Sequence, residues 1–191
     1  MKLPEDVQKS IEKQVPKVLK RDFESTFKNK FEELKNEMIK EFLTHPVTIE
    51  IKDGPNASNI SGTLGGDTNL FAFIGFNEGD DPITPILEIL QNTKYRRTKE
   101  NKGAQEFTVD LPQIKEIFSA APMPWASGRS WAQGIEVGIS GIGYLLRKNS
   151  SNSRSGAAIQ SRTKVRGGKF QNVPYISAII RKYEKKFSQL K

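Results

Sequence analysis

The spacing of apolar residues predicts a long helical region over residues 5–43. Large apolar side chains recur every three or four positions, and the positions between them are mostly Lys and Glu, so one face of the helix is apolar. This face consists of Leu19, Phe23, Phe27, Phe31, Leu34, Met38 and Phe42. Because Pro16 removes a backbone donor and crowds the preceding turn, we expect a short first helix and then a long one from Lys17 to Leu43.

So apolar a helix face has to be covered, and two interpretations differ in what covers it. The favoured one is packing on the rest of the same chain. The other is packing against a neighbouring subunit, for which Phe23, Phe27 and Phe31 are the candidate contact residues.

The next segment, residues 45–76, predicts two strands separated by a polar loop. His45-Pro46 ends the helix, and the alternating, β-branched "VTIEIK" reads as a strand. "LFAFIGF" also has the composition of a strand. The loop between them is rich in Gly, Ser and Asn, and part of it is a candidate assembly loop. Its residues are Ser61, Gly62, Thr63, Leu64, Gly65 and Gly66.

The remaining pattern predicts three helices and a long hairpin. Asp81 and Pro82 begin one helix, a charged segment over 93–106 leads into the strand-like "EFTVDL", and Pro112 begins a second short helix. Glycine-punctuated apolar residues and a polar loop predict a basic hairpin over 134–168, followed by an amphipathic helix over 173–190. The predicted fold class is therefore α+β, a mixed or antiparallel sheet with helices, divided into an N-terminal helical arm (1–44) and a core (45–191).

The amino-acid composition excludes several kinds of functional site. The chain has 191 residues, no Cys and one His, so disulfides, thiolate chemistry and multi-histidine metal sites are excluded. No apolar run approaches the roughly 20 residues of a membrane span, and the N-terminus lacks a secretory h-region. We therefore expect no membrane partner and a protein that works in the compartment where it is made.

The net charge of +8 is concentrated in one part of the chain. No acidic residue lies between Glu136 and Glu184, and most of the cations there form a basic stretch over 147–169, which suggests a local partner. Its members are Arg147, Lys148, Arg154, Arg162, Lys164, Arg166 and Lys169. They either belong to a solvated loop without a partner or contact phosphate or an acidic protein surface. Any nucleic-acid contact would be electrostatic and independent of sequence, because no zinc, helix-turn-helix or RNP signature is present.

No catalytic, cofactor or metal motif emerges. The Gly-rich loop lacks the Lys and hydroxyl of a P-loop, and neither a Rossmann fingerprint nor G-x-S-x-G is present. We interpret His45 as a residue at a helix C-terminus and the pair Asp80–Asp81 as capping charges rather than metal ligands. We therefore expect a protein that is not an enzyme and has no cofactor.

Two stretches carry a family resemblance. "FLTHPVTIEIKDGPNASNISGTLGGDTNLFAFIGF" and "SRTKVRGGKFQNVPYISAIIRKYEKKF" resemble the small head–tail joining proteins of tailed bacteriophages, known as neck, tail-completion or tail-terminator proteins. The resemblance covers about half of the chain and rests on phrases and layout. The long, Phe-striped N-terminal helix and the charged segment 93–106 depart from that layout.

The resemblance implies a virion protein of the neck, assembled in the host cytoplasm, that acts by forming an oligomeric ring, commonly of six copies, and by loops that become ordered on docking. Gly62, Gly65 and Gly66 would keep the candidate assembly loop adaptable until a partner orders it. Its partners would be copies of itself, the connector or adaptor, and tail-tube or tail-terminator proteins, with DNA passing through the channel. Two alternatives stay open at this point. One is a nucleic-acid-binding module that uses the stretch 147–169, and the other is an enzyme with a dispersed site for which His45 would be essential.

Overall fold

The computed structural model describes residues 5–64, 69–101, 104–138, 146–148, 158–160 and 170–190 and confirms the α+β class. Within this part of the chain, helices dominate and the strands form small antiparallel pairs. The helices are α1 Glu5–Thr44, α2 Pro46–Lys52, η1 Gly54–Asn56 (a 3₁₀ turn), α3 Leu70–Ile74, α4 Thr84–Gln91, α5 Ile114–Ser119, α6 Trp131–Val137 and α7 Ile176–Ser188. The strands are β1 Lys94–Asn101, β2 Ala104–Asp110, β3 Pro122–Met123, β4 Ala126–Ser130, β5 Leu146–Lys148 and β6 Ala158–Gln160.

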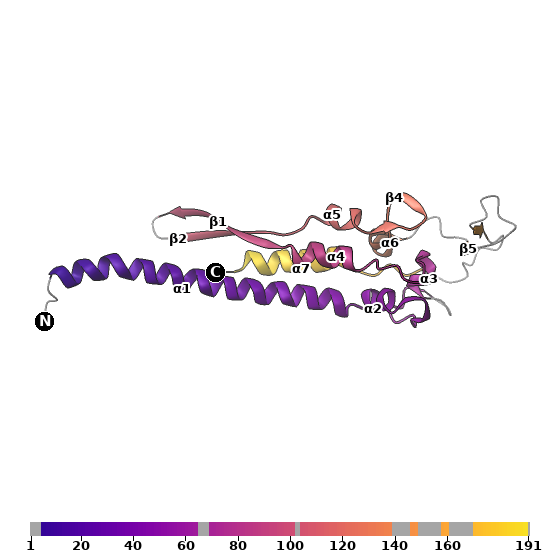
Figure 1. The fold of residues 1–191 in the computed structure, drawn as a ribbon, viewed down its shortest axis with the longest axis horizontal. Coiled ribbons are helices and arrows are strands. Elements are labelled where there is room, and N and C mark those ends of the chain that lie inside the picture. Colours follow the sequence, from indigo (N-terminus) through magenta and orange to yellow (C-terminus); the bar gives the residue numbers. More distant parts are fainter. Residues whose placement is uncertain are drawn as a thin grey trace.

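The long helix α1 supports the rest of the fold. Figure 1 shows α7 lying alongside the second half of α1 and the β1–β2 hairpin lying over the middle of α1, while the first part of α1 extends past the hairpin. The second half of α1 contributes to the same hydrophobic core as the later elements, through Phe27, Phe31, Met38 and Phe42. The favoured interpretation of the apolar face, packing within the chain, is therefore confirmed for these residues.

Polar contacts fix α7 on α1. Lys182 Nζ lies 2.6 Å from Glu41 Oε2, the Tyr183 hydroxyl donates to the same oxygen at 3.0 Å, and Lys186 Nζ lies 2.7 Å from Glu37. Partial burial alone would raise the pKa of Glu41, but the hydrogen bonds from Lys182 and Tyr183 and the nearby positive charges outweigh it and lower that pKa.

The first turn of α7 is capped from another element. Its N-cap residue provides no side-chain hydrogen bond; instead Glu136 of α6 accepts from the Ser177 backbone N–H at 2.7 Å and from the Ser177 hydroxyl at 2.5 Å. A carboxylate at this position satisfies a backbone donor and suits the helix dipole. The contact joins two helices whose sequences lie on either side of the basic stretch.

The expected break at Pro16 is wrong, because α1 runs without interruption from Glu5 to Thr44. A proline removes only one helical hydrogen bond. The neighbouring residues are mainly Glu, Lys, Gln and Leu, which are strong helix formers and continue the helix on both sides.

The strand expected at "VTIEIK" is also wrong, because these residues form α2. Pro46 occupies the first turn, and His45 Nδ1 accepts from the Val47 N–H at 3.3 Å, which makes His45 the N-cap. The buried positions are Val47, Thr48, Glu50 and Ile51, a helical rather than an alternating set. His45 thus begins α2 instead of only ending α1.

The strand expected at "LFAFIGF" is the short helix α3. Asn69 caps it, since its side-chain oxygen accepts from Ala72 N–H at 2.9 Å, and Gly75 ends it in the left-handed conformation at φ 93°. A Cβ on Gly75 would also lie 3.3 Å from the Trp125 ring, whose indole N–H donates to the Ile74 carbonyl at 2.7 Å. Local capping therefore overrides the strand preference of the aromatic run.

Two further boundaries differ from expectation. The charged segment 93–106 is not an insertion between elements, because most of it forms β1, which pairs antiparallel with β2. The region expected to start the basic hairpin at residue 134 is instead part of α6, which Ser130 caps by accepting from Gln133 N–H at 3.3 Å. Of that hairpin, the described residues are β5 and β6, which pair antiparallel as expected.

The other three expected helices are present, with shifted starts. The helix expected to begin at Asp81 and Pro82 is α4, which begins at Thr84 after the N-cap Ile83. Asp81 lies before this start, with Oδ1 accepting from the N–H groups of Ile83 and Thr84 and Oδ2 accepting from the Thr84 hydroxyl at 2.6 Å. These bonds, that from the Thr84 hydroxyl first, lower the pKa of Asp81. Asp80 accepts from the Asn77 N–H and so stabilises a turn, whereas of this acidic pair only Asp81 bonds to the first residue of the helix. Helices α5 and α7 begin two to three residues after the expected starts.

Candidate functional site

A buried carboxylate anchors the candidate assembly loop. The Glu50 side chain is 0% exposed; Oε2 accepts from the Ser61 N–H at 2.9 Å and Oε1 from the Leu70 N–H at 2.7 Å. Each carboxylate oxygen thus holds one end of the segment between Ser61 and Leu70. Such charge-assisted bonds are stronger than neutral ones, and a buried carboxylate without them would be very costly.

Further hydrogen bonds hold the same loop from inside. The Asn69 amide donates to the carbonyls of Pro55 and Ala57 at 2.8 and 2.9 Å, while its oxygen caps α3. The Ser61 and Thr63 hydroxyls lie 2.9 Å apart, and the Asn59 amide donates to the Leu64 carbonyl. The start of the loop therefore has a defined conformation within the isolated chain.

The loop also contacts the C-terminal segment that carries the second half of the resemblance. The Gln171 N–H donates to the Thr63 carbonyl at 2.9 Å, and the rings of Phe73 and Phe170 stack with centroids 5.8 Å apart. Below them, the buried Tyr175 hydroxyl lies 2.8 Å from the Thr48 hydroxyl of α2. Two segments more than 100 residues apart thus form one unit, with Glu50 and Tyr175 in its interior.

The predicted loop residues fall into two groups. Thr63 and Leu64 are buried, Ser61 is half-buried, and Gly62 is exposed with φ 65°, a conformation that favours glycine. Gly65 and Gly66 lie outside the described residues. We expected the glycines to keep this loop adaptable, but through residue 64 hydrogen bonds fix it.

The predicted inter-subunit helix face is largely covered by the chain itself. Phe27 is 6% exposed and stacks on Phe107 of β2 at 4.2 Å between centroids, and Phe31, 2% exposed, packs edge-on against Tyr95 of β1 at 4.8 Å. Phe23 is the exception, because it remains 40% exposed. Of the three, only Phe23 has a substantial surface left for a neighbour.

The basic stretch lies mostly beyond the described part of the chain. Arg147 and Lys148 belong to β5, where they pair with Ile159 and Ala158 of β6. The other five predicted contact residues lie outside the described residues; they are Arg154, Arg162, Lys164, Arg166 and Lys169.

His45 is held as a neutral, structural side chain. Desolvation lowers its pKa, and this outweighs the opposing effects of a hydrogen bond to the Pro174 carbonyl and of the Glu41 charge. Its ring lies 4.9 Å from that of Tyr175. Because Nδ1 accepts from Val47 and the other nitrogen donates to Pro174, both ring nitrogens are engaged in the fold.

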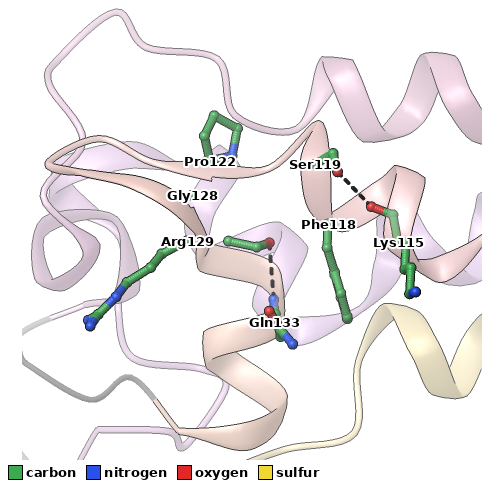
Figure 2. A pocket seen from close by; sticks show the side chains of 8 residues that line it. Lys115, Phe118, Ser119, Pro122, Gly128, Arg129 and Gln133 are labelled. Carbon is green, nitrogen blue, oxygen red and sulfur yellow. Dashed lines mark hydrogen bonds between the residues drawn. The ribbon is translucent and has the colours of Figure 1, made fainter.

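A hollow of about 450 Å³ lies between α5, β4 and α6 (Figure 2). Its lining is mixed, with two apolar residues among polar and charged ones; the lining residues are Lys115, Phe118, Ser119, Pro122, Gly128, Arg129, Ser130 and Gln133. The Ser119 hydroxyl donates to the Lys115 carbonyl, the Ser130 hydroxyl accepts from Gln133, and the Arg129 side chain points away from the hollow. This arrangement provides neither a nucleophile with a base nor paired carboxylates.

Within the described ranges, no group of three or more His, Asp or Glu side chains is placed to hold a metal ion. Nor does any helix there combine the length and apolarity of a membrane span. Comparisons with family models, with curated proteins and with solved structures returned no match.

Sequence reasoning missed the residues that build this site. Glu50, Asn69 and Tyr175 are buried and hydrogen-bonded to distant backbone or side chains. The one available signal was the position of Glu50 inside the apolar "VTIEIK", which was interpreted as the polar face of a strand.

Proposed function

We propose that this chain is a structural subunit of the neck of a tailed bacteriophage, which joins the head connector to the tail by ring assembly and without catalysis. The supporting observation is the unit formed by Glu50, the loop it anchors and the C-terminal segment. The resemblance rests on two separate stretches, and the hydrogen bonds Thr63–Gln171 and Thr48–Tyr175 join those same stretches. Segments that serve one assembly surface are expected to be held together in this way.

In this role, the anchored loop would act as a preformed contact. Because Ser61 and Leu70 are both bound to Glu50, the loop gives up less conformational entropy on docking than a free chain would. The partner would be a neighbouring copy, the connector or adaptor, or a tail-tube or tail-terminator protein, and DNA would pass through the channel of the ring.

The direct test is to count copies of the protein in purified phage particles with a quantitative antibody assay. Known amounts of the purified chain provide the calibration, and particles of an unrelated phage provide the control. About six or twelve copies per particle, as closed rotational symmetry requires, would support the role. Particles without the protein would contradict it.

A second candidate, binding of nucleic acid through residues 147–169, is favoured by one observation. Nine cations and no acidic residue lie between Glu136 and Glu184. Replacing the seven cations of the basic stretch with Gln should abolish binding to DNA and remove its steep salt dependence. The matched control replaces seven exposed cations outside the stretch with Gln, which should change binding much less. These residues are Arg21, Lys28, Lys30, Lys40, Lys52, Lys115 and Lys185.

A further inference from the structure

The β1–β2 hairpin is a two-stranded ribbon whose outer edges have no backbone partner in the part of the chain that the structure describes. Each strand pairs there only with the other, and no further backbone hydrogen bond involves residues 94–101 or 104–110. Unpaired strand edges are templates for pairing with another chain. The ribbon is therefore a candidate surface for strand addition.

The two faces of the ribbon differ in chemistry. Tyr95, Phe107 and Val109 pack on the core. The opposite, outer face carries Lys94, Arg96 and Thr98 on β1 and Glu106, Thr108 and Asp110 on β2, as strand alternation requires. The outer face is exposed, since the side chains of Arg96 and Asp110 remain 69% and 52% accessible.

Charge is divided across the width of this face. The described ionisable residues of β1 on it are both positive, Lys94 and Arg96, and those of β2 are both negative, Glu106 and Asp110. Within the chain this division is favourable, because Arg96 lies 3.4 Å from Asp110 and Lys94 is opposite Asp110 in the strand register. The ribbon of a second copy has the same division, with cations on its β1 and carboxylates on its β2.

We propose that copies of this chain associate through the ribbon, with β1 of one copy alongside β2 of the next. This pairing sets cations against carboxylates, whereas β1 against β1 or β2 against β2 would set like charges opposite each other. The arrangement continues the antiparallel order of the hairpin from copy to copy. It deepens the proposed function, on whose ring it rests, by naming the surface that joins the subunits.

The geometry makes this contact head-to-tail and weak. Two different edges meet, so the interface is heterologous and generates a ring where the rotation closes. The register of β1 shifts between Arg97 and Lys99, which divides the strand into two short regular parts, Lys94–Arg97 and Lys99–Asn101. A pairing this short buries little surface, so pairs of free copies should be transient and only the closed ring stable.

Cross-linking tests the arrangement directly, because the chain has no native Cys. Copies carrying Thr98→Cys and copies carrying Thr108→Cys are mixed and treated with a flexible bis-maleimide, one variant being enlarged by a fusion tag. We expect mixed dimers at least about fivefold in excess of either homodimer, as two favourable against two unfavourable charge pairs imply. Homodimers equal to or exceeding mixed dimers would overturn the proposal.

The matched control is a pair of exposed positions away from the ribbon, Ser119→Cys and Ser188→Cys. It should show no preference for mixed dimers. If the ribbon pair cross-links no better than this pair, the proposal is overturned as well. Far-ultraviolet circular dichroism checks the fold of each variant, and Glu106→Cys replaces Thr108→Cys where the latter does not fold.

A charge-swapped ribbon separates electrostatic pairing from general stickiness. The variant Lys94→Glu, Arg96→Glu, Glu106→Lys and Asp110→Lys keeps its internal attraction, so its copies should cross-link with one another but not with unswapped copies. A variant with Arg181→Glu and Glu78→Lys, both outside the ribbon, should mix freely with unswapped copies. Free mixing by the swapped ribbon would contradict the proposed pairing.

The two proposals fail separately. Mixed cross-links without the protein in phage particles would keep the ribbon interface and remove the neck role. Six or twelve copies per particle without mixed cross-links would keep the neck role and remove this interface.

Discussion

The loop anchored by Glu50 and the β1–β2 ribbon are held to the same core in opposite ways. The loop is fixed by directional hydrogen bonds to buried polar side chains, above all Glu50 and Asn69. The ribbon is fixed by aromatic rings, with Phe27 and Phe31 of α1 packed on Tyr95 and Phe107. Directional bonds define the backbone conformation of residues 59–64 and 69–70, whereas ring packing secures one face of the ribbon and leaves its backbone edges available.

The largest expected loss of stability comes from removing an aromatic ring of α1 that packs on the ribbon. Phe31→Ala should lower the free energy of unfolding by about 3–5 kcal/mol, because it leaves a cavity between the rings of Tyr95 and Phe187. Urea denaturation followed by circular dichroism measures it. The control Phe23→Ala, at a position 40% exposed, should cost well under half as much. Equal losses for the two variants would contradict the aromatic anchoring of the ribbon.

Replacing the carboxylate that anchors the loop should lower the free energy of unfolding less, and its effect should be concentrated near the loop. Glu50→Gln replaces one acceptor oxygen with an NH₂ group that faces a backbone N–H, so the free energy of unfolding should fall by about 1–3 kcal/mol. Hydrogen exchange should accelerate much more at the Ser61 and Leu70 amides than at Trp131, whose N–H donates to the Ala121 carbonyl.

The exposed Glu78→Gln is the control for Glu50→Gln and should change neither quantity. Unchanged exchange at Ser61 and Leu70 in Glu50→Gln would show that the carboxylate does not hold the loop.

The smallest expected effect is a pH dependence of the free energy of unfolding, caused by His45. His45 lies on the loop side and its pKa is lowered, so the unfolded chain takes up a proton first as the pH falls below about 6.5. Stability should therefore decline from pH 6.5 downward, with a slope of at most about 1.4 kcal/mol per pH unit for one proton.

The variant His45→Asn keeps an N-cap but does not titrate, so it should lack this decline. Glu41 acts in a separate window, because its lowered pKa removes stability only below its ordinary value of 4.5. Denaturation midpoints between pH 5 and 8 provide the measurement. Identical slopes for the two proteins would contradict the buried, neutral state of His45.

The sequence was most informative where one pattern extended over several turns. The apolar faces of α1 and α7 were recognised from helical spacing, whereas the shorter α4 and α5 were recognised from Asp81, Pro82 and Pro112 near their starts. Helices α2, α3 and α6 have five to seven residues, too few for a period to appear, and their side-chain caps at His45, Asn69 and Ser130 decide the conformation.

The ribbon and the anchoring role of Glu50 could not be predicted from the sequence, for two different physical reasons. Strand β1 is mostly charged because only one of its faces is covered, so a single apolar residue, Tyr95, marks it. Glu50 has the side chain of a surface residue, and its burial follows from backbone donors at Ser61 and Leu70 that only the folded chain brings together. The family resemblance from the sequence stays a prediction that the particle assay can test.

The Glu136–Ser177 contact has a consequence for how this chain can change. Together with the hydrogen bond from Val173 N–H to the Ile135 carbonyl, it closes the base of the segment that contains the basic stretch. The end of α6 and the start of α7 are therefore bound to each other directly, through two contacts that involve no residue between 139 and 169. A change confined to those residues leaves both contacts in place.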